Sequence, residues 1–83
     1  MENKVNTQAI IEYFHLDSDD PAMLEKALEA MWQRVGVLEA AIVSAITKND
    51  LKTKSDLEAE VREISRLRVV TQDRIIQLRM AKY

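Results

Sequence analysis

The sequence predicts an all-α protein in which a short N-terminal helix is followed by a long antiparallel helical hairpin. One glycine and one proline in 83 residues argue against an all-β or a disordered chain. Alanine, leucine, glutamate, lysine and arginine, which favour helices, dominate the composition. Apolar residues recur at spacings of three and four through two stretches of similar length. The length fits a single domain over residues 1–83.

The first predicted element is a short helix over residues 7–15. Ile10, Ile11 and Phe14 lie on one side of it. A helix of this length is only marginally stable in water by itself, so we expect its apolar side to dock on the rest of the chain. The residues that follow, His15 to Asp20, are mostly acidic or polar and predict a loop.

The second predicted element is a long helix over residues 21–48. Asp20 can cap free backbone N–H groups, and Pro21 suits the first helical position because its missing N–H would have no partner there. Lys48-Asn49 marks the end, since asparagine tolerates the left-handed conformation that ends many helices. The heptad seam of this helix is Leu24, Leu28, Met31, Val35, Leu38, Ile42 and Ala45.

The third predicted element is a helix over residues 53–82. Its start falls between Asp50 and Ser55, where Ser55 with Glu58 has the spacing of a capping box and Thr53 with Asp56 is an alternative. Its apolar stripe is Leu57, Val61, Ile64, Leu67, Thr71, Ile75 and Leu78.

The two long helices are predicted to form an antiparallel, coiled-coil-like pair. They have similar lengths and a connection of only a few residues, as in helical hairpins. Folding the chain about Asn49 places Leu38 beside Ile64 and Val35 beside Leu67, so apolar positions face one another.

The run from Val35 to Ile46 is too apolar for a helix that packs on one neighbour. We therefore expect the hairpin to dimerise, forming a four-helix bundle, through a surface of small and apolar residues. The alternative is that this surface packs under the N-terminal segment of a monomer. The predicted self-association residues are Gly36, Val37, Ala40, Ala41, Val43 and Ser44.

A second group of surplus apolar residues lies near the C-terminus: Val69, Ile76, Met80 and Tyr83. One interpretation is that this group receives Ile10 and Phe14 of the N-terminal segment, since the chain enters the second helix near this end. The other is that it forms a groove for a helix of a partner protein.

Charge is distributed unevenly along the chain. Residues 1–51 hold four positive and nine negative side chains, whereas residues 52–83 hold eight positive and five negative ones. This asymmetry favours folding back of the chain or packing against a second copy. Arg66, Arg68 and Arg74 belong to the basic portion and are candidate contacts to nucleic acid phosphates. The alternative is a solvated helix face in which arginines pair with nearby glutamates.

The sequence gives no indication of an enzyme. It has no cysteine and one histidine, which excludes disulfides and cysteine-ligated zinc and argues against a histidine metal site. The carboxylate pairs lack an apolar pocket that would shift their pKa values. We expect no metal, no cofactor and no small-molecule substrate.

No signal peptide is visible, and the apolar run is far shorter than a membrane-spanning helix of about 20 residues. We therefore expect a soluble cytoplasmic protein. The predicted function is that of a small helical protein that forms a homodimer and binds another protein as an adaptor, chaperone or regulator. The alternatives are a nucleic-acid-associated regulator that uses the basic face of the last helix, and a structural oligomerisation component of a phage or secretion assembly.

Overall fold

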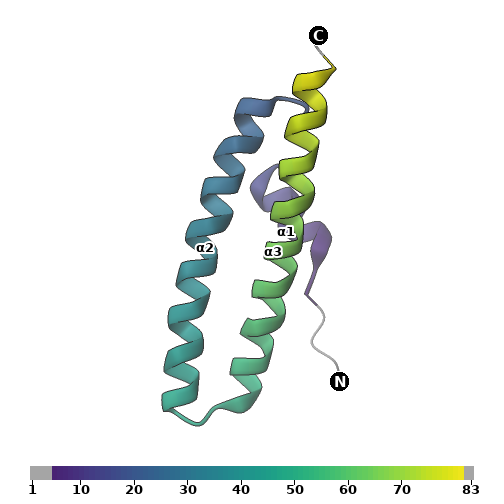
Figure 1. Cartoon of the computed structure of the whole chain (residues 1–83). Coiled ribbons are helices and arrows are strands. Elements are labelled where there is room, and N and C mark those ends of the chain that lie inside the picture. The colour runs from purple at the N-terminus through teal and green to yellow at the C-terminus, as the bar shows by residue number, and fades with distance from the viewer. Residues whose placement is uncertain (1–4, 82–83) are drawn as a thin grey trace.

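The computed structural model describes residues 5–81, which form a short helix and a long helical hairpin (Figure 1). Helix α1 spans Thr7–Phe14, α2 spans Pro21–Thr47 and α3 spans Leu51–Met80. The long helices α2 and α3 lie side by side and run in opposite directions. The all-α prediction and the order of the elements are confirmed.

Helix α1 is short and closed at both ends by local hydrogen bonds. The Asn6 side chain accepts a hydrogen bond from the backbone N–H of Ala9 at 3.0 Å, which caps the first turn. His15 ends the helix with φ of 58°, in the left-handed region. The Leu16 N–H then donates to the Ile11 carbonyl at 2.9 Å, which is the arrangement of a Schellman motif.

Helix α2 begins as the sequence predicts. The Asp20 carboxylate accepts a hydrogen bond from the Ala22 N–H at 3.0 Å, and Pro21 occupies the first helical position. At the other end Asn49 adopts the expected left-handed conformation, with φ of 57°. The Asp50 N–H donates to the Ala45 carbonyl at 2.8 Å and closes the helix.

Helix α3 begins at Leu51, two residues before the predicted position, and ends at Met80 rather than at residue 82. Its cap is Asp50, which accepts hydrogen bonds from the N–H and the hydroxyl of Thr53 at 3.2 and 2.7 Å. These bonds lower the pKa of Asp50. The predicted cap at Ser55 is wrong. The left-handed conformation of Asn49 reverses the chain, so that the next residue, Asp50, caps α3 directly.

The core lies between α2 and α3 and follows the predicted seams. Leu24, Met31 and Ile64 have no more than 1% of their surface exposed. Leu28 and Ile42, at the margins of the α2 seam, are half-buried. The other buried residues of the hairpin are Pro21, Ala27, Val35, Leu38, Ala45, Leu67, Thr71 and Ile75.

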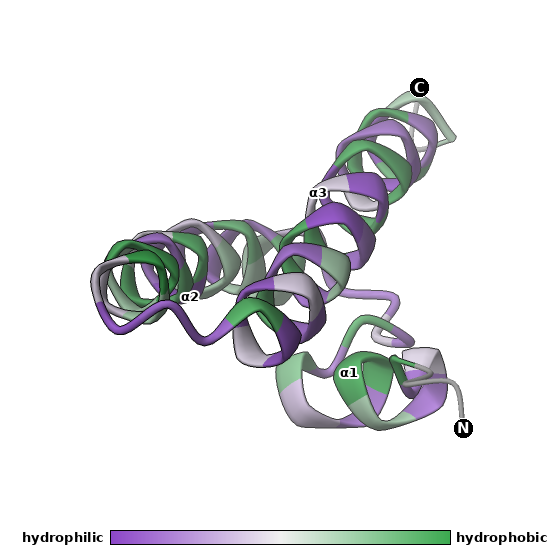
Figure 2. Cartoon of the chain, turned by 90° about the horizontal axis from the view of Figure 1, so that it is seen from below, coloured by the Kyte–Doolittle hydropathy of each residue, from purple (hydrophilic) through white to green (hydrophobic). Residues whose placement is uncertain are grey.

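Helix α1 packs on one side of the α2–α3 pair, near its middle. In Figure 2 it lies below the layer formed by the two long helices, and the opposite side of that layer is not covered. Phe14 and Leu16 are buried in the core cluster that includes Met31, Leu38 and Ile64. The loop after α1 is held by Arg74, which bonds to Asp19 and to the Ser18 carbonyl.

Within residues 5–81, no helix combines the length and the apolar composition needed to cross a membrane.

Candidate protein interaction surfaces

The predicted self-association residues lie on the side of α2 that is turned away from α3. Gly36, Val37, Ala40, Val43 and Ser44 are exposed. Val37 and Val43 have 59% and 63% of their surface accessible, which is high for valine. Ala41, at the edge of this surface, is half-buried. Because these positions are one to two turns apart, they form one continuous surface.

Helix α1 leaves most of this surface uncovered. A shallow groove of about 470 Å³ separates α1 from α2, and Val37 is the residue nearest the α2 C-terminus in its lining. The groove is lined by Tyr13, Phe14, His15, Met23, Lys26, Ala27, Ala30, Gln33, Arg34 and Val37. Ala40, Val43 and Ser44 lie beyond it, and within residues 5–81 they are exposed.

The apolar residues near the C-terminus do not receive α1. Val69, Ile76 and Met80 have 65%, 56% and 68% of their surface exposed. Ile10 and Phe14 instead pack on the cluster around the middle of the hairpin. The chain reverses direction in the loop before α2, so α1 lies beside the middle of the hairpin and not at the end where α2 begins and α3 ends (Figure 1). Tyr83 lies outside the described residues.

Each of the three candidate nucleic-acid arginines is engaged within the chain. Arg66 forms an ion pair with Glu63 at 2.7 Å. Arg74 pairs with Asp19. The Arg68 guanidinium carbon lies 4.7 Å from the centre of the Trp32 ring, a cation–π contact. Its Nε is buried and has no hydrogen-bond partner among residues 5–81. Arg66 and Arg74 therefore pair with acidic side chains of the chain, whereas Arg68 packs on Trp32.

The side of the α2–α3 pair opposite α1 forms a further surface, which we call the open face. Two contacts between α2 and α3 mark it: Trp32 with Arg68, and Glu25 with Arg79 at 2.7 Å. On α2, residues at intervals of seven share this side of the helix. They are Glu25, Trp32, Glu39 and Ile46, with Glu29, Gly36 and Val43 beside them.

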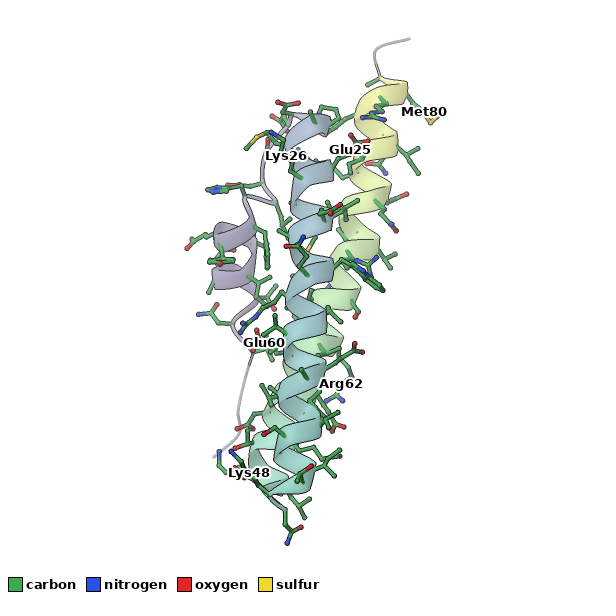
Figure 3. All side chains as sticks on the ribbon, turned by 90° about the vertical axis from the view of Figure 1, so that its left-hand side faces the viewer. Glu25, Lys26, Lys48, Glu60, Arg62 and Met80 are labelled. Atoms are coloured by element: carbon green, nitrogen blue, oxygen red, sulfur yellow. The ribbon has the colours of Figure 1, made fainter. Side chains whose placement is uncertain are left out.

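Charges of opposite sign are separated across the open face. Glu25 and Arg62 point to this side of the molecule in Figure 3, whereas Lys26, Lys48 and Glu60 point to the side of α1. The acidic side chains Glu25, Glu29 and Glu39 follow α2, and the basic side chains Arg62, Arg68 and Arg79 follow α3, where Glu58 forms an ion pair with Lys54. This separation was not predicted from the sequence, although Glu25 and Glu39 are two heptads apart and therefore share one side of α2.

The ion pair between Glu63 and Arg66 lies near the start of α1, and the pKa of its carboxylate is strongly lowered. Hydrogen bonds from Arg66 and from the Thr7 hydroxyl lower the pKa of Glu63 from its usual value of 4.5 to about 2. The same pair raises the pKa of Arg66. Glu63 lies on α3 and Thr7 at the start of α1, so the carboxylate joins the two elements.

The lowered pKa of Glu63 predicts a loss of stability in acid. The charged carboxylate stabilises the folded chain above pH 4.5, and this contribution is lost as the pH falls from about 4.5 to about 2. Urea denaturation as a function of pH should therefore show a smaller loss over this range for Glu63→Gln than for the natural chain. Arg66→Gln should reduce the loss in the same way, because it removes the main hydrogen-bond donor. Equal acid sensitivity in all three proteins would contradict the assignment.

No group of three or more His, Cys, Asp or Glu side chains within residues 5–81 is placed to hold a metal ion. Comparisons with known protein families, with curated proteins and with solved structures give no match to this chain.

Proposed function

We propose that this protein is a helical docking protein that pairs with a second copy of itself and binds another protein as an adaptor, chaperone or regulator. The observation that carries the proposal is the exposed surface of α2 between Val35 and Ile46. Within this segment Glu39 is the only charged residue, and Val37, Val43 and Ile46 have more than half of their surface exposed.

Exposure of such an apolar surface to water is energetically unfavourable for a monomer of this size. A domain of this length buries little of its apolar surface on folding, so it gains stability from association. Exposed valine and isoleucine side chains on one helix, next to small residues, allow another helix to approach closely. The internal pairing of Arg66, Arg68 and Arg74 favours this proposal over binding of nucleic acid.

Sedimentation equilibrium over a wide concentration range tests the proposal. We expect a dimer, and we expect Val43→Glu and Ile46→Glu each to weaken it at least tenfold, because each places an unpaired charge in an apolar contact. Ala22→Glu is the matched control, since Ala22 is exposed in the first turn of α2, far from this segment.

The outcomes separate the candidate functions. A monomer at all concentrations would overturn self-association. A mass that grows beyond a dimer would favour a structural component of a larger assembly. A dimer that survives both glutamate variants would show that another surface makes the contact. Circular dichroism of each variant verifies that the helices are retained.

A further inference from the structure

From the distribution of charge we propose that the open face binds a second copy of this chain, with α2 of each copy packed on α3 of the other. The two copies are related by a two-fold axis parallel to the helices. This inference rests on the self-association proposed above, and it specifies the surface and the relative direction of the two hairpins.

The open face offers apolar surface from the middle of the hairpin to the turn. Trp32, Val43 and Ile46 have 61%, 63% and 52% of their surface exposed on α2. Leu28 and Ile42 lie half-buried between them and the core. On α3 the half-buried Val61, seven residues before Arg68, lies on the same side and continues this surface. Since α1 packs on the other side, no part of α1 shields these residues (Figure 2).

Several charged side chains of the open face have no counterpart within the chain. Glu29, Glu39 and Arg62 form no ion pair among residues 5–81, although the same chain pairs Arg34 with Glu60 and Arg79 with Glu25. The unpaired acids are on α2 and the unpaired base is on α3. A surface that carries opposite charges on its two edges is complementary to a copy of itself, provided that the edges are exchanged.

Two arrangements bring the open faces of two copies together with two-fold symmetry. An axis perpendicular to the helices stacks α2 on α2 and α3 on α3, which places glutamates against glutamates and arginines against arginines. An axis parallel to the helices stacks α2 on α3 twice. Like charges in contact disfavour the first arrangement, and opposite charges favour the second.

The register of the hairpin identifies the pairs. Contacts of Arg34 with Glu60, Trp32 with Arg68 and Glu25 with Arg79 show that positions at the same height on α2 and α3 have residue numbers adding to about 100. An axis parallel to the helices preserves height. Glu39 of one copy therefore faces Arg62 of the other, and Glu29 faces the region of Arg68.

Charge reversal tests this arrangement. In sedimentation equilibrium at low salt, Glu39→Arg and Arg62→Glu should each weaken the dimer about tenfold, because each replaces two attractive contacts per dimer with two repulsive ones. An equimolar mixture of the two variants should form a heterodimer as tightly as the natural chain, since both contacts again join opposite charges. High salt should reduce all of these differences.

Two exposed positions away from the open face serve as matched controls. Lys26→Glu makes the same change of charge as Arg62→Glu, and Glu12→Arg makes the same change as Glu39→Arg. Neither should alter the dimer by more than about twofold. If E39R associates more tightly than the natural chain, α2 faces α2 and the proposed arrangement is wrong. If both reversals leave a dimer unchanged, the contact lies on another surface and only this inference fails. A natural chain that stays monomeric would overturn the proposed function as well.

Discussion

Replacement of Ile64 by alanine is expected to destabilise the folded chain by about 2–5 kcal/mol. Ile64 is 1% exposed and belongs to the cluster where α1, α2 and α3 meet. Its neighbours in this cluster include Phe14 from α1 and Leu38 from α2, so the truncation leaves a cavity that no single helix can close. Small domains are stable by only about 5–15 kcal/mol, so the variant loses a large part of its stability. Urea denaturation followed by circular dichroism measures the change.

Val70→Ala is the matched control for this truncation. Val70 is on the same helix and has 51% of its surface exposed, so we expect a change within about 0.5 kcal/mol. Similar losses at the two positions would mean that α3 does not present Ile64 to the core, and the register of the hairpin would then be incorrect.

Replacement of Phe14 by alanine is expected to cost about 3 kcal/mol or more and to release α1 from the hairpin. Phe14 is 9% exposed and supplies the largest buried side chain of α1. An eight-residue helix is not stable without tertiary contacts, so loss of this anchor should unfold it. Amide hydrogen exchange should then increase from Thr7 to Phe14, whereas α2 and α3 retain most of their protection.

Tyr13→Ala provides the comparison within α1. The Tyr13 ring is 75% exposed and touches Phe14 edge to face, with ring centres 4.9 Å apart. We expect a loss of about 0.5–1.5 kcal/mol, the usual contribution of such an aromatic pair. A larger effect for Tyr13 than for Phe14 would place the wrong aromatic side chain in the core.

The hairpin could be predicted from the sequence because its determinants are local and periodic. The seam from Leu24 to Ala45 has the spacing of a buried helix side, and a short connection leaves an antiparallel partner as the only neighbour. Asp20-Pro21 and Asn49 act through backbone geometry at their own positions, so the start and the end of α2 followed directly.

The position of α1 could not be predicted in the same way. Its apolar side fits either the middle of the hairpin or the Val69–Met80 surface, and the choice depends on the direction in which the loop between Phe14 and Pro21 turns. The left-handed His15 and the bonds from Arg74 to the loop determine this direction. None of these contacts has a periodic signal in the sequence.

The open face was missed for a related reason. The glutamates of α2 and the arginines of α3 are visible in the sequence, but which side of the hairpin stays uncovered depends on where α1 packs. The start of α3 was misplaced because Asp50 and Ser55 both satisfy the rules for a cap. Asp50 is the cap because it directly follows Asn49, whose left-handed conformation reverses the chain.

The sharp turn at Asn49 also gives the chain a direction of folding. Contacts next to the turn, such as those of Ala45, close a loop of only a few residues, whereas the Glu25–Arg79 pair joins residues more than fifty positions apart. Loop-closure entropy is paid first where the loop is shortest, so α2 and α3 can zip together from the turn towards the chain ends.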